Sequence, residues 1–193
     1  MKTGTNLHSY PVFPDWVFEG HLELDNSILN EIIRELSNTK KSAGAETNFG
    51  WVTAKNTNLG PNVYALNKLV MNMFWDNVVP HYRLGEENRN VELTETWAIS
   101  VKPSHTVPVN VERHRWYQAV VFLQSPENGA NLFLDQFNAK LYATPVGVQP
   151  YTHYIEAKQN KVVFFPSHIP WGFTPNLGTI NTTTLCSSFI IKK

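Results

Sequence analysis

Cysteine, long apolar runs and an excess of charge of one sign are missing from this sequence, or nearly so. Cys186 is the single cysteine among 193 residues, so the chain can form no internal disulfide and no cysteine-based zinc site. No stretch reaches the roughly 18 apolar residues of a membrane-spanning helix. The 16 basic and 16 acidic side chains balance, which argues against a broad surface for nucleic acid or anionic membranes.

Targeting and catalytic signatures are missing as well. The opening stretch, MKTGTNLHSYPVFPDW, contains no apolar segment of the kind found in signal peptides, so secretion by that route is not expected. With its lone cysteine, the chain is predicted to belong to a reducing cytoplasm or to an assembly made there. Gly-x-Ser-x-Gly, P-loop and Gly-x-Gly-x-x-Gly motifs do not occur, so a hydrolase elbow or a nucleotide site has no support.

Apolar and aromatic residues, by contrast, are plentiful. They make up 42% and 12% of the chain, enough for a packed core. The length predicts one domain over residues 1–193. Within it we expect an extended N-terminal arm over 1–20, helical support over 21–90 and a β-rich core over 91–193.

Two helices are predicted in the support region. Apolar residues recur at helical spacing from Ile28 to Leu36, and this helix is expected to end near Ser37–Asn38. Pro61 begins a second helix, which Pro80 ends. The segment FGWVTA, residues 49–54, lies between the two and is predicted to be a short strand. Both helices are expected to support a sheet.

From residue 91 onward the apolar pattern changes to short β-rich runs separated by turn residues. Such regular spacing favours a sandwich or barrel. The fold class predicted is therefore α+β, with two N-terminal helices supporting an antiparallel β domain of two layers. Cys186 lies in the run TTTLCSSFII and is predicted to be a small strand residue rather than a reactive thiol.

Polar residues gather in the stretch VNVERHRWYQAVVFL, residues 109–123. Asn110, Glu112 and His114 alternate, so a strand would turn them to one face. The segment FFPSHIPWGFTPN, residues 164–176, would approach that face from a distant strand. Two ligands at i and i+2, with a third from elsewhere, is the pattern of an iron site made of two histidines and a carboxylate.

The order of these segments, with the strand NLFLD between them and SSFII after them, resembles the 2-oxoglutarate/Fe(II)-dependent oxygenase superfamily. It is most similar to the prolyl-hydroxylase-like group of tailed phages. The resemblance covers the chain from about Phe13 to its end. It implies a double-stranded β-helix, a distorted jelly roll, with flanking helices.

The resemblance also assigns positions to the metal and co-substrate. The first two metal ligands fall on Asn110 and Glu112, the third on Trp171, and the arginine that binds 2-oxoglutarate on Thr184. Asn is a weak neutral ligand for Fe(II), and an indole cannot coordinate a metal. Without an arginine, the bidentate grip on a carboxylate is lost. A degenerate site with no catalytic residues, no metal and no cofactor is therefore predicted.

An alternative keeps the enzyme. Glu112, His114 and His168 have the composition of a facial metal site for Fe(II) with 2-oxoglutarate as co-substrate, and Lys161 could supply the charge of the missing arginine. This arrangement requires a shifted register at one strand. Separately, His114 could be a solvated strand-end residue and His168 a turn residue.

Three functions follow from these readings. The first is an inactive oxygenase fold used as a structural or binding component of a tailed-phage virion, in its tail, neck, baseplate or capsid, with partners docking through sheet edges or the N-terminal arm. Its partners would be proteins, in a homo- or hetero-oligomer, with no nucleic acid and no membrane. It would be located in the virion or the host cytoplasm. The second is an active dioxygenase of the prolyl-hydroxylase kind, and the third is a sugar binder on the same scaffold.

Overall fold

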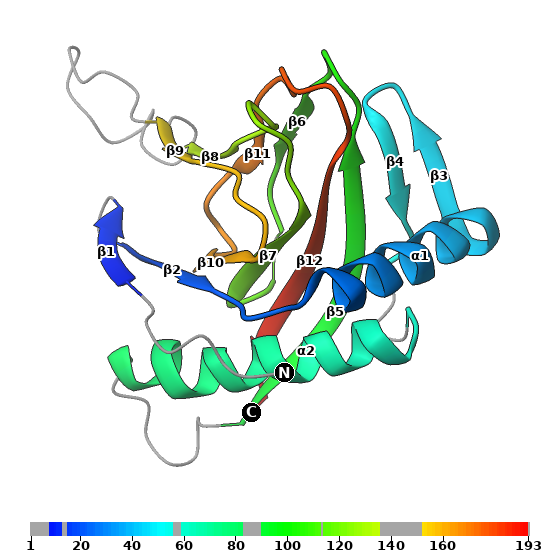
Figure 1. Cartoon of the computed structure of the whole chain (residues 1–193). Helices are drawn as coiled ribbons and strands as arrows, with labels where there is room; N and C mark the ends of the chain where they lie inside the picture. Colours follow the sequence, from blue (N-terminus) through cyan, green and yellow to red (C-terminus); the bar gives the residue numbers. More distant parts are fainter. Residues whose placement is uncertain are drawn as a thin grey trace, which may run out of the picture.

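The chain folds into two helices, a large β-sheet and a smaller sheet that packs on the face of the large sheet opposite the helices (Figure 1). The computed structural model describes residues 8–12, 15–55, 59–82, 90–112, 114–135 and 152–192. The expected α+β class and jelly-roll architecture with two supporting helices are confirmed. In the described segments, no helix is long and apolar enough to cross a membrane.

The large sheet is antiparallel in all of its strand pairings. In spatial order its strands are β1 (His8–Val12), β2 (Asp15–His21), β10 (Lys161–Pro166), β7 (Tyr117–Gln124), β12 (Thr182–Ile191), β5 (Val91–Val101), β4 (Gly50–Thr53) and β3 (Gly44–Thr47). The order brings segments from both ends of the chain together, because β10 pairs with β2 on one side and β7 on the other.

The small sheet is antiparallel too. Its strands, in spatial order, are β6 (Val107–Asn110), β11 (Trp171–Phe173), β8 (Leu132–Asp135) and β9 (Thr152–Ile155). Their inward side chains meet those of the large sheet in one apolar cluster, which includes Leu132, Phe173 and Val120. The space between the sheets is therefore a packed interior.

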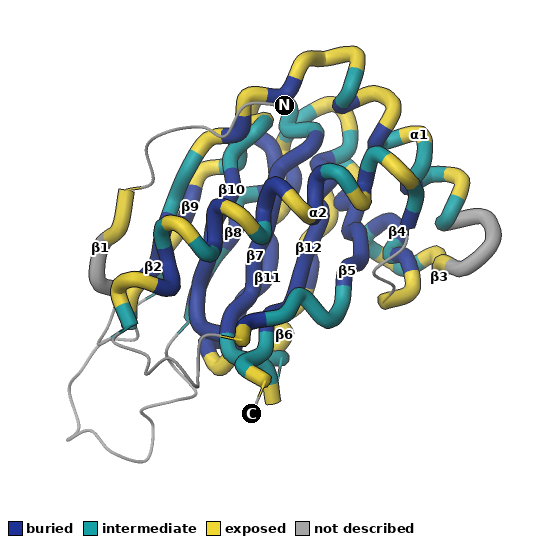
Figure 2. Tube along the Cα trace, turned by 90° about the horizontal axis from the view of Figure 1, so that it is seen from below, coloured by how far each residue is buried: buried dark blue, intermediate teal, exposed yellow. Residues whose placement is uncertain are grey.

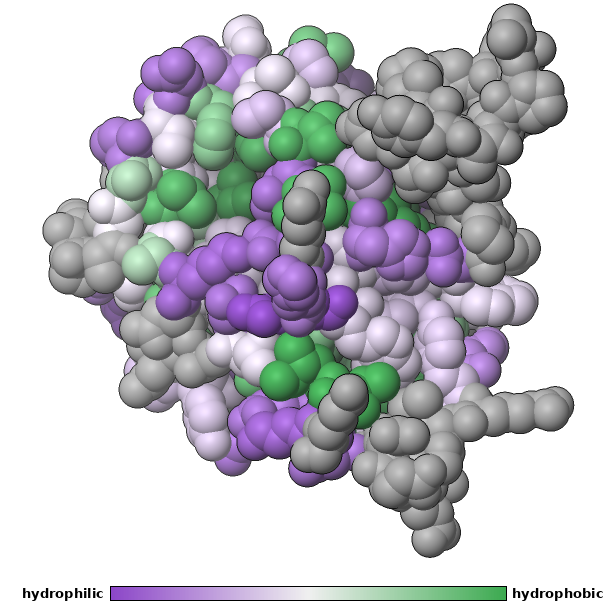
Figure 3. Space-filling view, turned by 180° about the vertical axis from the view of Figure 1, so that it is seen from behind, coloured by the Kyte–Doolittle hydropathy of each residue, from purple (hydrophilic) through white to green (hydrophobic). Residues whose placement is uncertain are grey.

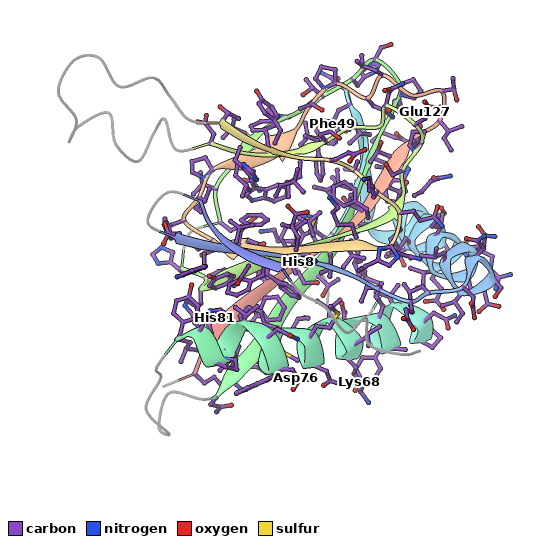
Figure 4. All side chains as sticks on the ribbon, turned by 60° about the vertical axis from the view of Figure 1, so that its left-hand side comes forward. His8, Phe49, Lys68, Asp76, His81 and Glu127 are labelled. Carbon is purple, nitrogen blue, oxygen red and sulfur yellow. The ribbon has the colours of Figure 1, made fainter. Side chains whose placement is uncertain are left out.

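Helix α1 (Asn26–Ala43) and helix α2 (Pro61–Met73) cover the other face of the large sheet. A π-helical turn (Phe74–Val78) and a 3-10 turn (Val79–His81) continue α2. Figure 4 shows Lys68 and Asp76 on the outer side of this helical segment, away from the sheet. The predicted start at Pro61 and the supporting role of both helices are confirmed, whereas α1 extends past the predicted end near Ser37–Asn38.

Glu35 of α1 ties the two helices together. Its carboxylate accepts hydrogen bonds from the backbone amides of Asn62 and Val63, at 3.0 and 3.1 Å, and from the Asn62 side chain at 2.8 Å. The first amides of a helix have no partner within the helix, and a negative charge there is favourable. Glu35 therefore does for α2 what a capping residue usually does.

The central strands are buried on both of their faces, as the dark tube of Figure 2 shows. Along β7, Ala119 and Val121 contact the helices, whereas Val120 and Phe122 face the small sheet. This alternation explains why the sequence YQAVVFLQ is almost continuously apolar instead of alternating with polar residues.

The expected division of the chain into arm, helical support and β core needs correction. Residues 15–21 form β2, an interior strand of the large sheet, and Phe18 is only 1% exposed. β3 and β4 also belong to that sheet although they precede residue 91. Part of the predicted arm is therefore a strand of the sheet, and it covers the edge that β10 would otherwise expose. Residues 1–7 lie outside the described residues.

The described surface has no single dominant apolar area. Large exposed apolar side chains are scattered over different elements, namely Trp16, Tyr64, Val109, Val111, Tyr154, Leu177 and Ile180. On the face shown in Figure 3, hydrophilic side chains separate smaller apolar areas. Isolated exposed apolar residues of this kind are ordinary for a folded protein.

Candidate functional site between the two sheets

A β-bulge in β6 sets the geometry of the predicted site. Trp171 of β11 lies opposite Asn110, and Phe173 lies opposite Val107, so β6 spends three residue steps where β11 spends two. Residues opposite each other in a ladder share a face. The bulge therefore brings Asn110 beside Trp171, as the resemblance requires of the first and third ligand positions.

Trp171 itself is a core residue. It is 1% exposed, and its ring makes edge contacts with Phe165 and Phe173 at centroid distances of 6.0 and 5.9 Å. No described residue accepts a hydrogen bond from its indole Nε1, which is buried. An aromatic plug thus stands at the position expected of the third ligand.

Glu112, at the second ligand position, is bound by a cation from another part of the chain. Lys55, which follows β4, places its Nζ 2.6 Å from Glu112 Oε1. The Asn110 amide donates its Nδ2 hydrogen to the same oxygen at 3.2 Å. The Glu112 side chain is only 13% exposed, so these two donors satisfy a carboxylate that is largely removed from water.

The ionic contacts extend to β5. Lys55 Nζ lies 3.5 Å from Glu95 Oε2 and 4.6 Å from the centre of the Trp97 ring. Arg115 Nη2 donates to Glu95 Oε1 at 2.8 Å. Burial opposes ionisation of Glu95, yet the hydrogen bond from Arg115 and the charge of Lys55 outweigh it and lower the pKa of this carboxyl below its usual value.

The co-substrate position, Thr184, lies in the middle of β12 and is fully buried. Its hydroxyl donates to the Ile99 carbonyl at 3.4 Å and lies 3.9 Å from the Cys186 sulfur. Burial raises the pKa of Cys186 to about 12. Both residues are buried parts of β12 with contacts inside the sheet. Thr184 offers no positive charge to a carboxylate ligand.

The residues of the alternative iron site have other partners. His168 Nε2 lies 3.1 Å from Asp15 Oδ2, and its side chain is 62% exposed. His114 is an exposed residue with a φ of 66°, and Lys161 pairs with Glu19 at 3.0 Å. Across the described segments, no three His, Cys, Asp or Glu side chains are placed to hold a metal ion together.

Fe(II) does not fit the side chains that converge here. A facial iron site needs three ligands with free lone pairs directed at one point. Asn110 directs its amide nitrogen at Glu112, the carboxylate is bound by an ammonium, and the third position is a buried indole. We therefore derive no reaction step through a metal or 2-oxoglutarate.

Sequence reasoning missed Lys55 and Arg115. Arg115 stands in the stretch ERHRW close to Glu112, whereas Lys55 is 57 positions away from Glu112 in the chain. The one available signal was a charged residue directly after the apolar strand FGWVTA. Nothing in a single sequence connects that position to β5 and β6, because the sheet order decides it.

The fold of this chain is similar to that of several solved structures. A Pseudomonas putida prolyl-4-hydroxylase superposes with a TM-score of 0.58 at 13% identity, covering 92% of this chain and 93% of the other. This is the fold of the 2-oxoglutarate/Fe(II) oxygenases. The collagen prolyl hydroxylase of Paramecium Bursaria Chlorella virus-1, in complex with 2-oxoglutarate, gives a TM-score of 0.61 at 12% identity and covers 92% and 96%.

A third neighbour was solved with both a metal and 2-oxoglutarate bound. HygX from Streptomyces hygroscopicus, with nickel and 2-oxoglutarate bound, gives a TM-score of 0.62 at 10% identity and covers 91% and 83%. At the level of sequence, the chain matches no protein-family model and no curated protein. The expected likeness to this superfamily is thus confirmed for the fold, while identities this low leave activity to be argued from the site.

Proposed function

We propose that this chain is a non-catalytic protein built on the oxygenase fold, acting as a structural or binding component of a protein assembly. The observation that carries the proposal is Trp171, which is 1% exposed and lies opposite Asn110 at the expected third ligand position. A buried indole neither binds a metal nor leaves room for one, and it contributes to stability as core.

The charges around Glu112 support the same conclusion. In an oxygenase, the carboxylate ligand is free to bind Fe(II), whereas here Lys55 and Asn110 already occupy its Oε1. Thr184 also lacks the guanidinium group with which an arginine would bind a co-substrate carboxylate through two hydrogen bonds. Residues that bind a metal or co-substrate would not pack as well at these positions. The residues present suit a stable core and do not suit either ligand.

The assembly we propose is a tailed-phage particle, because the order of the sequence segments resembles that of the prolyl-hydroxylase-like group of such phages. The chlorella-virus hydroxylase shows that the same fold also occurs in a viral protein. Partner proteins would dock on the outermost strands of the two sheets, such as β3 and β9. An exposed edge strand presents backbone donors and acceptors that another chain can pair with.

Anaerobic metal binding tests the lack of catalysis. Fe(II) or Mn(II) is added with and without 2-oxoglutarate, and bound metal and melting temperature are measured, with the Pseudomonas hydroxylase as positive control. Ligand at about 100 times its Kd stabilises a protein by about 2.7 kcal/mol, or several degrees. We expect this rise for the control and none for this chain.

The Asn110→His/Trp171→His double variant is the matched test of the assignment. It restores histidines at the two ligand positions while leaving Glu112 in place. If the positions are assigned correctly, the double variant should bind more metal than the wild type does. It should also be less stable, because it loses the buried indole. Stoichiometric metal in the wild type, with a rise in melting temperature that depends on 2-oxoglutarate, would refute the proposed function.

The assembly role has its own measurement. Sedimentation velocity over a wide concentration range should show self-association, or the chain should be found by mass spectrometry in purified particles of the phage that encodes it. A protein that stays monomeric and is absent from particles would contradict the structural role without restoring the enzymatic one.

A further inference from the structure

We propose that Lys55 acts as a built-in cation that takes the electrostatic place of a metal ion, holding Glu112, which follows β6, close to Glu95 of β5. The inference rests on the proposed function, in which no catalytic metal binds. It goes further by naming the side chain whose charge stands in for a metal and by giving the carboxylate at the second ligand position a structural role.

The geometry assigns this role because one ammonium group contacts three side chains from two other segments of the chain. Its Nζ is 2.6 Å from Glu112 after β6, 3.5 Å from Glu95 on β5, and 4.6 Å from the ring of Trp97 on β5. Lys55 itself follows β4. An ammonium has three donors that can point in different directions, as this bridging requires.

The carboxylates need such a cation. Glu95 Oε2 is buried and accepts no hydrogen bond from the described residues, and Lys55 Nζ lies 3.5 Å from it. Glu112 is largely buried, and its second donor, Asn110, is neutral. Two partly buried carboxylates without a shared cation would repel each other. Arg115 engages Glu95 on its other oxygen, Oε1, leaving Oε2 to Lys55.

The contacts also differ from an ordinary surface ion pair. Lys192 and Glu92 lie 2.7 Å apart with side chains 49% and 46% exposed, as solvated pairs do. In the Lys55–Glu112 pair the lysine side chain is 41% exposed but the glutamate side chain only 13%, and the face of Trp97 covers one side of the ammonium. Lower exposure of the glutamate weakens solvent screening, so the Lys55–Glu112 pair should matter more than the Lys192–Glu92 pair.

The test compares Lys55→Met, Lys55→Met/Glu112→Gln and Lys192→Met by thermal unfolding of the full chain at neutral pH without added metal. We expect Lys55→Met to lower the melting temperature by about 3–8 °C and Lys192→Met by about 1 °C or less. The Glu112→Gln change should return at least half of the loss, because it removes the carboxylate that Lys55→Met left unpaired.

Each outcome decides the matter. A Lys55→Met loss no larger than that of Lys192→Met overturns the inference. So does a double variant that recovers nothing, because lost packing of the lysine chain would not be repaired by Glu112→Gln. Stoichiometric metal in the wild type, measured in parallel, would overturn the proposed function as well; either of the first two results without such metal overturns this inference alone.

Discussion

Both faces of the large sheet are buried, but different elements and different side chains cover them. On the helix face, Phe74 stacks on Phe189 at 4.3 Å, and helical side chains fill the remaining space. On the face toward the small sheet, Trp171, Phe165 and Phe173 fill a space enclosed by short strands. The helix face carries none of the expected ligand positions. The other face is where the resemblance places the metal.

The comparison teaches that a catalytic interior and a structural interior can share one backbone. The bulge in β6 and the pairing of Asn110 with Trp171 keep the backbone arrangement expected of a ligand set. In the function we propose, the side chains alone change what that arrangement does, because an indole and an ammonium stand where the resemblance places a histidine and a metal. Variants on the two faces test whether both interiors now serve stability.

The largest effect is expected from truncating one aromatic residue on each face. Trp171→Ala and Phe74→Ala should each lower the free energy of unfolding by about 3–5 kcal/mol, because each leaves a cavity in a packed core. Urea unfolding measures both. A cost below about 1 kcal/mol for Trp171→Ala alone would mean that the two faces do not contribute equally to stability. It would also mean that Trp171 is not needed for core packing.

A smaller difference is expected between buried polar pairs. On the face toward the small sheet, Gln118 Nε2 donates to Ser188 Oγ at 2.9 Å, and on the helix face Asn67 Nδ2 donates to Thr96 Oγ1 at 3.1 Å. Ser188→Ala should cost about 1–3 kcal/mol, because it leaves both ends of the fully buried Gln118 amide unpaired.

Thr96→Ser is the matched control for Ser188→Ala, since it keeps the hydroxyl on the helix face and should cost less. Chemical denaturation of both variants gives the comparison. Equal losses would mean that the hydroxyl of Ser188 contributes no more to stability than the methyl group of Thr96, and that its hydrogen bonds to Gln118 contribute little.

The smallest effect concerns Cys186, on the face toward the small sheet. Its thiol is fully buried, and burial raises its pKa to about 12, so it stays protonated in the folded protein. An unfolded cysteine ionises near pH 8.5. Stability should therefore fall as the pH rises above that value, since only the unfolded state then releases the proton.

Thiol labelling checks the same point. Iodoacetamide at pH 8 should modify Cys186 slowly in the native protein and rapidly in denaturant, because the thiolate is the reactive form. Fast labelling of the native protein would show that the space between the sheets opens to solvent, and would separate this face from the helix face.

Several features could be predicted from local patterns. The helix begun by Pro61, the strand within FGWVTA and the short strands after residue 91 follow from helical or β periodicity and turn residues. The end of α1 was predicted too early because the polar run SNTKK continues the helix without an apolar signal. β2 was taken for part of an arm, since Pro11 and Pro14 suggest an extended lead-in and nothing local reveals its pairing with β10.

The candidate site divides in the same way. The order of motifs was enough to assign Asn110, Glu112, Trp171 and Thr184 as the expected ligand and co-substrate positions, and the ladder does bring Asn110 and Trp171 together. The identity of these residues, readable in the sequence, already argues against coordination. His114 and His168 could be excluded from a shared site with Glu112 only after their partners and exposure were known.

The sequence alone determined the fold class, the two supporting helices and the chemical unsuitability of an indole as a ligand, because periodicity and residue type are local properties. Only the tertiary structure decided that Lys55 neutralises Glu112 and Glu95. The order of strands places β4, β5 and β6 around one ammonium, and such long-range neighbours depend on sheet topology, which no short stretch of sequence encodes.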